Sequence, residues 1–255
     1  MPHMRREPEL PEDIGKYALF LDFDGTLAEI APQPWLASLD PDTARTLAAL
    51  WQRLDGALAL ISGRELDDID AMVGLPQLPA AGIHGAQLRS PGGQVATEDW
   101  MRAEIDEVEA DLRNGIQSFE GLLLERKPVA VAVHYRGNPG REEEIRALAA
   151  RIVRPHPHLK CLSGRKIVEI LPARVDKGRA IARLMELPPF FGRIPLFAGD
   201  DITDEDGLVA VKALGGIAIK IGGGPSVADY GFPTGERFRH WLHQLALQVP
   251  AEKSA

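Results

Sequence analysis

Residues 17–26, YALFLDFDGT, decide the fold expected for this chain. An uninterrupted apolar run meets two carboxylates and a glycine, which is typical of a buried parallel strand that ends at a ligand-binding edge. Similar runs occur at 57–64, 79–88, 194–200 and 216–221, and helical periodicity occurs at 41–54, 177–186, 204–214 and 235–248. This alternation predicts an α/β protein built like a Rossmann fold, with a parallel sheet.

The pattern changes after the Pro-Gly-Gly turn at 91–93. The sequence then predicts a helix (100–118), a hairpin (122–136, turning at 126–128), a second helix (140–153) and a second hairpin (158–172, turning at 163–164). Helix, hairpin, helix, hairpin is an α+β pattern inside an α/β chain, and it favours an inserted domain. We therefore expect a core formed by residues 1–98 and 173–255, and an inserted domain at 99–172.

Composition excludes several classes of protein. The chain has 255 residues, 45% of them hydrophobic, which fits a globular protein. Lys and Arg number 29 against 37 Asp and Glu, and this net charge of −8 argues against a nucleic-acid partner. The single cysteine, Cys161, forms no intrachain disulfide and no cysteine-rich zinc site. No apolar stretch predicts a membrane span or a signal peptide, so no membrane partner and a cytoplasmic location are expected.

Two groups of carboxylates follow apolar runs. If the extended backbone continues past residue 22, Asp22 and Asp24 face the same side and share one small space. Such a pair suits a nucleophile beside a general acid/base, or a Mg²⁺ site, although Asp residues also cap turns. Asp200 and Asp201 end another apolar run, whereas the acidic residues at 204–206 fit a solvated helix start equally well.

Two further residues fall at matching positions, Ser62 at the end of a run and Lys177 at the start of a helix. A hydroxyl and an ammonium at the same edge of the sheet could hold phosphate oxygens. Taken singly, a serine is more often a helix cap and a lysine a solvated surface residue.

Together, DFDGT (22–26), Ser62, Lys177 and GDD (199–201) resemble the motifs of the haloacid dehalogenase superfamily of phosphohydrolases. The resemblance implies that Asp22 is the nucleophile and that Asp24 protonates the leaving oxygen and then activates water. It also implies a Mg²⁺ ion bound by Asp22, the carbonyl of Asp24 and Asp200, with Asp201 in its outer shell. Ser62 and Lys177 would hold the phosphoryl group, and the inserted domain would be the cap of that superfamily.

A narrower resemblance extends along nearly the whole chain. It is carried by DFDGTLAEI, ALISGR, AGIHGA, LERKPVAVAVHYR, KIVEILP, DKG, FAGDDITDED and IKIGGG, and these segments resemble the trehalose-6-phosphate phosphatases. The resemblance implies release of trehalose and phosphate from trehalose 6-phosphate. Such phosphatases also occur fused to a synthase, for which this chain has no room, and we expect it to act alone, as a monomer. It also implies sugar contacts from the inserted domain through Glu125, Lys127, His134, Arg136 and Glu169. By themselves, Glu125, Lys127 and Glu169 would suggest cross-strand ion pairs.

Arg64 and His84 are further candidates for substrate binding, although a surface arginine and a structural histidine fit them as well. A phosphatase of another sugar phosphate, such as sucrose phosphate or mannosyl-phosphoglycerate, a phosphosugar mutase with a similar cap, and a non-catalytic sugar-phosphate sensor remain alternatives. A cysteine-dependent phosphatase does not fit, because it needs Cys-x5-Arg and Ile167 stands six residues after Cys161.

Overall fold

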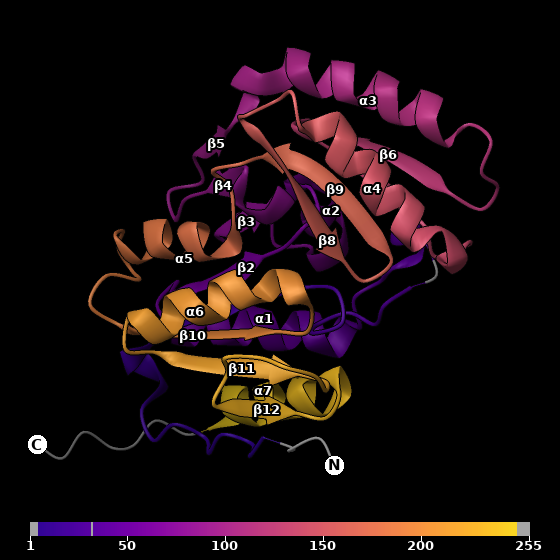
Figure 1. The fold of residues 1–255 in the computed structure, drawn as a ribbon. Helices are drawn as coiled ribbons and strands as arrows, with labels where there is room; N and C mark the ends of the chain where they lie inside the picture. The colour runs from indigo at the N-terminus through magenta and orange to yellow at the C-terminus, as the bar shows by residue number, and fades with distance from the viewer. Residues whose placement is uncertain (1–4, 32, 249–255) are drawn as a thin grey trace, which may run out of the picture. The chain divides into compact units, whose positions relative to one another are not determined.

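The strand that ends before Asp22 lies in the middle of a mainly parallel sheet. The computed structural model describes residues 5–31 and 33–248, and within these residues the sheet has eight strands (Figure 1). In sheet order they are β12 (Tyr230–Phe232), β11 (Ile217–Ile221), β10 (Ile194–Gly199), β1 (Tyr17–Leu21), β2 (Leu58–Ile61), β3 (Ala80–Gly82), β4 (Gln87–Arg89) and β5 (Val95–Thr97). Neighbours from β12 to β3 pair in parallel, and β4 runs antiparallel to β3. The predicted α/β fold with a parallel sheet is confirmed.

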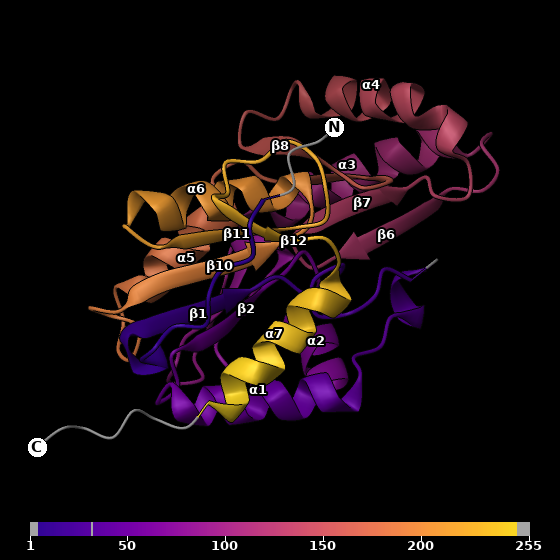
Figure 2. The ribbon, with the colours of Figure 1, turned by 90° about the horizontal axis from the view of Figure 1, so that it is seen from below.

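Helices cover both faces of this sheet. One layer holds α5 (Lys177–Met185) and α6 (Glu205–Ala213), and the other holds α1 (Pro41–Arg53), α2 (Leu66–Val73) and α7 (Gly235–Leu247) (Figure 2). Asp40 and Thr234 cap α1 and α7 by accepting hydrogen bonds from amides of the first turn. Because both faces are covered, the central strands are apolar along their whole length rather than alternating.

The core of this sheet is built from the apolar runs noted in the sequence. Leu19, Phe20, Leu60 and Phe197 are fully or almost fully buried. The ring of Phe20 stacks on Phe190 with 5.2 Å between the ring centroids. Successive side chains of a strand point to opposite faces, so each strand packs against both helix layers at once.

The segment 79–88 forms a strand that ends at a glycine, as its sequence indicates, and then a turn and a second short strand. β3 ends at Gly82, a 3₁₀ turn covers Ile83–Gly85, and β4 then returns antiparallel. The backbone φ angles of Ile83 (47°), His84 (56°) and Gly85 (106°) are positive, and this left-handed stretch reverses the chain. The sequence analysis also lacked α2 and β12, which are short elements of eight and three residues.

The chain forms two compact units. The second unit consists of Ala96–Val175 together with Asp201–Thr203, and the first consists of the other described residues. The interval 99–172, for which the sequence predicts an inserted domain, lies inside the second unit. Within the described residues, no helix combines the length and apolarity needed to cross a membrane.

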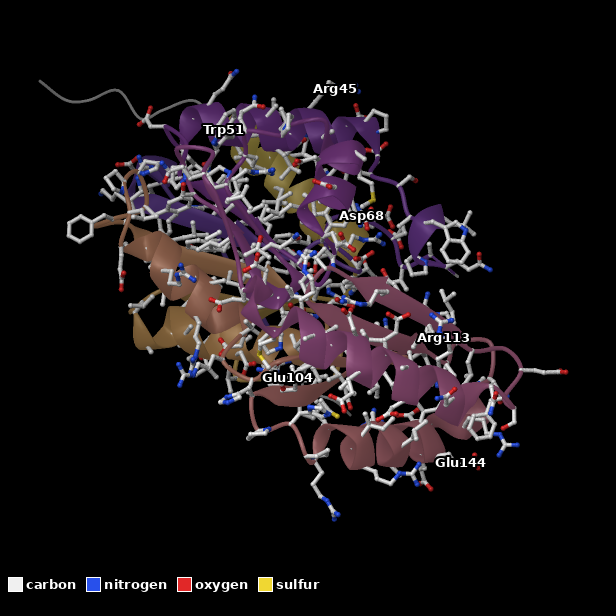
Figure 3. The ribbon with its side chains drawn as sticks, turned by 90° about the horizontal axis from the view of Figure 1, so that it is seen from above. Arg45, Trp51, Asp68, Glu104, Arg113 and Glu144 are labelled. Atoms are coloured by element: carbon white, nitrogen blue, oxygen red, sulfur yellow. The ribbon has the colours of Figure 1, made fainter. Side chains whose placement is uncertain are left out.

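The second unit has its own antiparallel sheet. Within the described residues this sheet has four strands, in the order β6 (Leu123–Lys127), β7 (Ala130–His134), β9 (Ile167–Pro172) and β8 (Leu159–Gly164). The helices α3 (Arg102–Ile116) and α4 (Glu142–Val153) cover one face, where a separate apolar core forms (Figure 1). Arg113 on α3 and Glu144 on α4 are exposed (Figure 3). Glu125, Ala132 and Glu169 lie opposite one another across β6, β7 and β9, so they form a row on one face of the sheet.

Both hairpins form, but their turns lie further along the chain than predicted. Strand pairing continues to Lys127 and Ala130 in the first hairpin and to Gly164 and Ile167 in the second. The turns are therefore residues 128–129 and 165–166, and Lys166 has a φ of 64°. The strands therefore include Arg126, Lys127 and Gly164. Their polar or flexible character does not prevent this, because cross-strand hydrogen bonding tolerates such residues.

Candidate active site

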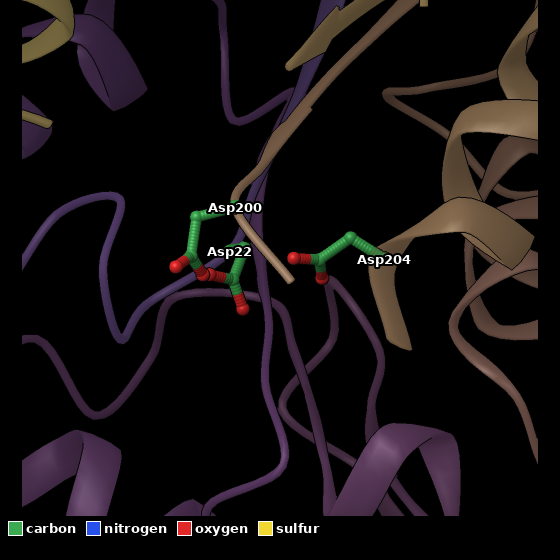
Figure 4. A group of neighbouring side chains, drawn as sticks. All are labelled: Asp22, Asp200 and Asp204. Atoms are coloured by element: carbon green, nitrogen blue, oxygen red, sulfur yellow. The ribbon is translucent and has the colours of Figure 1, made fainter. Parts of the chain in front are cut away.

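Three carboxylates meet at the carboxyl ends of two neighbouring strands. Asp22 follows β1, Asp200 follows β10, and Asp204 stands immediately before α6 (Figure 4). Each offers an oxygen atom, and these atoms lie within 4.8 Å of one another. Because β1 and β10 are parallel neighbours, their carboxyl ends share one edge of the sheet, as the sequence predicts.

Two glycines make room for this cluster. Gly25 has a φ of 83°, and a Cβ atom there would lie 2.3 Å from Oδ2 of Asp200. A Cβ atom on Gly199 would lie 2.4 Å from the carboxyl carbon of Asp204. The carboxylates therefore approach the backbone at places where no side chain fits.

Lys177 neutralises part of this charge. It is the first residue of α5, it is buried, and its Nζ donates to Oδ1 of Asp22 (2.6 Å) and Oδ1 of Asp204 (2.5 Å). Burial opposes the charged form, but the carboxylates of Asp204 and Asp22 outweigh it and raise the pKa of Lys177 above its ordinary value.

Asp22 is the most constrained carboxylate of the cluster. Burial and the neighbouring charge of Asp204 raise the pKa of Asp22 well above its ordinary value, against the opposing effect of Lys177. Its second oxygen, Oδ2, accepts a hydrogen bond from the Thr26 hydroxyl at 3.1 Å. Three carboxylates with one ammonium have a formal charge of −2 when ionised, and such a set of hard oxygen donors fits Mg²⁺.

Asp24 is not a member of the cluster. The extended backbone does not continue past Asp22, because residues 23–28 form a tight turn in which Leu27 and Ala28 donate to the carbonyl of Phe23. The Asp24 carboxylate instead forms an ion pair with Arg64 at 2.7 Å. The carboxylates of Asp22 and Asp24 therefore have different partners, Lys177 and Thr26 for the first and Arg64 for the second.

Asp201 also lies outside the cluster, and Asp204 is the residue that the sequence analysis missed. The Asp201 carboxylate accepts from the amide of Arg165 (3.0 Å), which also belongs to the second unit. Asp204 is fully buried, whereas Asp206 is exposed. The position of Asp204 directly before α6 could have indicated its role in the cluster. The acidic run at 204–206, however, contains several residues that fit such a role equally well.

Ser62 and His84 occupy adjoining turns of the first unit. Ser62 is buried at the end of β2, and its backbone carbonyl accepts from the amide of His84 at 2.8 Å. The His84 ring lies against Gly63, where a Cβ atom would be 2.7 Å from Nε2. The left-handed conformation of His84 costs free energy, and such strain is concentrated at functional sites.

Lys220 is a buried lysine that the sequence analysis did not single out. It lies on β11, and its Nζ donates to the backbone carbonyl of Asp200 at 2.5 Å. A Glu205 carboxylate oxygen lies 3.9 Å from the same nitrogen. Lys220 thus fixes the main chain of a residue in the cluster.

The candidate sugar-binding residues of the second unit form two pairs. Nε2 of His134 lies 2.6 Å from Oε2 of Glu125, and Nζ of Lys127 lies 2.5 Å from Oε1 of Glu169. Burial raises the pKa of Glu125, but the hydrogen bond with His134 and the charge of Lys127 outweigh it and leave that pKa below its ordinary value. Arg136 is exposed, two residues after His134. Glu125, Lys127, His134 and Glu169 are therefore paired within this unit.

Solved structures of a hydrolase and of a phosphatase share the fold of this chain. A haloacid dehalogenase-like hydrolase from Bacteroides thetaiotaomicron shares the fold with a TM-score of 0.65 at 14% identity, over 90% of this chain and 99% of that chain. The C-terminal domain of a trehalose-6-phosphate phosphatase from C. albicans shares it with a TM-score of 0.83 at 20% identity, over 96% of this chain and 99% of that chain.

Sequence comparison is more specific. Residues 20–229 match the family described as trehalose-phosphatase. Over 248 residues the chain is 39% identical to the trehalose-6-phosphate phosphatase of Escherichia coli K12, covering 96% of this chain and 93% of that protein. The chain belongs to the trehalose-phosphatase family, which is a family of phosphoric monoester hydrolases. The resemblance to the trehalose-6-phosphate phosphatases is confirmed, and the fold is the one expected from the resemblance to the haloacid dehalogenase superfamily.

Proposed function

We propose that this protein hydrolyses trehalose 6-phosphate to trehalose and phosphate, in a reaction that depends on Mg²⁺ and passes through an aspartyl-phosphate on Asp22. The observation that carries the chemical part is the buried cluster of Asp22, Asp200 and Asp204 around the ammonium of Lys177. Family membership supports the choice of substrate.

Asp22 is the nucleophile of this proposal. One of its carboxylate oxygens forms a bond to phosphorus while the bond from phosphorus to the sugar oxygen breaks. Lys177 and Thr26, which hold the two oxygens of Asp22, fix the carboxylate for in-line attack. Asp22, Asp200 and Asp204 supply oxygen ligands to Mg²⁺, together with the carbonyl of Asp24. When bound, Mg²⁺ supplies positive charge that favours the ionised carboxylate and offsets the charge of the phosphoryl group.

Asp24 and Ser62 complete the chemistry. Asp24 gives a proton to the departing sugar oxygen and then takes a proton from the water that attacks the aspartyl-phosphate, so that both products leave and Asp22 is regenerated. The Ser62 hydroxyl donates a hydrogen bond to a phosphoryl oxygen. This use of one residue as acid and then as base leaves no net change in the enzyme.

The second unit is the cap in this proposal and supplies sugar recognition. Glu125, Lys127, His134, Arg136 and Glu169 are charged or polar, and a disaccharide needs such partners because its hydroxyl groups must be paired when they leave water. The two pairs found in the structure hold the side chains of Glu125, Lys127, His134 and Glu169 in fixed positions. Substrate hydroxyls then meet an ordered set of donors and acceptors.

The test is phosphate release from trehalose 6-phosphate, sucrose 6-phosphate, glucose 6-phosphate and p-nitrophenyl phosphate, each with Mg²⁺ and with EDTA. A Mg²⁺-dependent preference for trehalose 6-phosphate is expected. Asp22→Asn should remove turnover, whereas Asp68→Asn, at an exposed position on α2 (Figure 3), should not. Turnover of another ester in place of trehalose 6-phosphate would reject the substrate, and turnover of none would favour a sensor.

A further inference from the structure

The side chain of Arg64 is already engaged in several hydrogen bonds to other residues of the protein. Arg64 lies two residues after Ser62, at the end of β2, and its side chain is 11% exposed. Nε donates to Oδ2 of Asp24 at 2.7 Å, and Nη2 donates to Oδ1 of the same carboxylate at 2.7 Å. Nη1 donates to the backbone carbonyl of Pro34 at 3.0 Å. The planar guanidinium thus donates hydrogen bonds to both carboxylate oxygens of Asp24 and to the main chain at Pro34 at the same time.

The backbone of Arg64 joins a second functional residue to the same centre. Its amide donates to Oγ of Ser62 at 3.1 Å. The guanidinium carbon lies 5.8 Å from the centre of the Phe23 ring, between Asp22 and Asp24 in sequence. Arg64 therefore links the turn that carries Asp24 to the turn that carries Ser62, although the two turns are about forty residues apart.

We propose that Arg64 is a positioning residue for Asp24 and not the substrate-binding residue that its place after Ser62 suggested. Proton transfer to the leaving oxygen depends on the place and direction of the Asp24 carboxylate, and small displacements of a reacting group are costly. Asp24 is 38% exposed, so without a clamp its side chain is free to rotate into water. The two parallel hydrogen bonds from Arg64 remove that freedom.

This inference rests on the proposed role of Asp24, and it makes the importance of Arg64 depend on the leaving group. A sugar alkoxide leaves poorly unless it receives a proton, whereas p-nitrophenolate leaves without one. Loss of the clamp therefore slows hydrolysis of the sugar ester more than hydrolysis of p-nitrophenyl phosphate. A direct contact to substrate would instead raise KM for the sugar ester and leave kcat unchanged.

The experiment is a double-mutant cycle. Arg64→Lys keeps the charge but loses the two-pronged geometry, and Arg64→Gln is a second variant that also tests the charge. Each is made in the native sequence and in Asp24→Asn, and kcat and KM are measured with trehalose 6-phosphate and p-nitrophenyl phosphate. We expect kcat for trehalose 6-phosphate to fall by about 10-fold to 100-fold, which is part of the roughly 100-fold to 10,000-fold that general acid–base catalysis contributes. We expect KM to change less than about threefold, and no further loss in the Asp24→Asn background.

Arg89→Lys is the matched control. Arg89 is a buried arginine in the same unit that also donates to both oxygens of one carboxylate, from Nη1 and Nη2 to Asp70 at 2.8 and 2.6 Å. It should lower the melting temperature without changing the ratio of the two substrate rates. A rise in KM alone, an equal loss with both substrates, or an additive loss in Asp24→Asn would overturn the inference. Wild-type turnover reports separately on the proposed function, and if another sugar phosphate proves to be the substrate, the same cycle is run with that ester.

Discussion

Replacing Asp200 by Asn should make the metal-free protein more stable and should remove its response to Mg²⁺. The substitution keeps the size of the side chain and removes one negative charge from the cluster of Asp22, Asp200 and Asp204. Asp200 is half-buried, and its main chain is held by Lys220. The local structure therefore survives the change, and the charge is the main variable.

The magnitude follows from the spacing of the carboxylates. Two unit charges separated by 4.8 Å repel by about 3.5 kcal/mol at an effective dielectric constant of about 20. Asp200 faces two carboxylates and the ammonium of Lys177, so roughly one such repulsion remains. Partial exposure to solvent reduces it, and we expect a gain in unfolding free energy of about 1–2 kcal/mol, or a few degrees in melting temperature.

The assay is unfolding by heat and by urea, in EDTA and in saturating Mg²⁺. In EDTA, Asp200→Asn should be more stable than the wild type. With Mg²⁺ at about 100 times its Kd, the wild type should gain about 2.7 kcal/mol and the variant little, so the order of stability reverses.

Asp206→Asn is the control, because Asp206 belongs to the same acidic run but is exposed. Asp206→Asn should change neither the stability in EDTA nor the stabilisation by Mg²⁺. Equal stability of Asp200→Asn and wild type in EDTA, together with equal stabilisation by Mg²⁺, would refute the assignment of this cluster as a cation site.

Three further predictions concern single positions. Gly25→Ala should abolish Mg²⁺-dependent stabilisation and lower kcat by more than about 100-fold, because a Cβ atom would lie 2.3 Å from the Asp200 carboxylate; a Mg²⁺ titration by thermal shift and an activity assay measure both effects. Lys127→Met should destabilise the protein by about 3–5 kcal/mol, because it leaves the buried Glu169 without its ammonium partner, and it should raise KM for trehalose 6-phosphate far more than for p-nitrophenyl phosphate. Burial raises the pKa of Cys161 to about 11, so alkylation by iodoacetamide should be slow at pH 8 and should increase about tenfold per pH unit up to that pKa, as mass spectrometry would show; rapid labelling at pH 7 would contradict this.

The edge of the sheet that carries the site was predictable from the sequence, because in an α/β chain an apolar run that ends in carboxylates is typical of a buried strand that reaches a ligand-binding edge. Asp22, Asp200 and Lys177 come together for that reason. Asp204 could not be distinguished from Asp206, since both fit the start of a helix and burial alone separates them. The local sequence indicates where each strand ends, but it does not indicate how deeply each side chain is buried.

Two other features could not be predicted from local sequence patterns. The clamp between Arg64 and Asp24 joins residues about forty positions apart and depends on where their side chains reach. The left-handed turn at Ile83 and His84 was missed because a β-branched residue such as isoleucine rarely has a positive φ. In each case the surrounding tertiary structure decides the outcome.

The position of β1 in the sheet has a consequence for biosynthesis. β1 lies between β2 and β10, but β10 follows Ala96–Val175 in the chain. On the ribosome, the edge of β1 that will meet β10 therefore stays unpaired while about eighty residues of the second unit are made. That unit has its own core, and domains generally fold as units during synthesis. The second unit can therefore fold before the sheet of the first unit is complete, and Asp22 gains Lys177, Asp200 and Asp204 only after residues 177–204 have been synthesised.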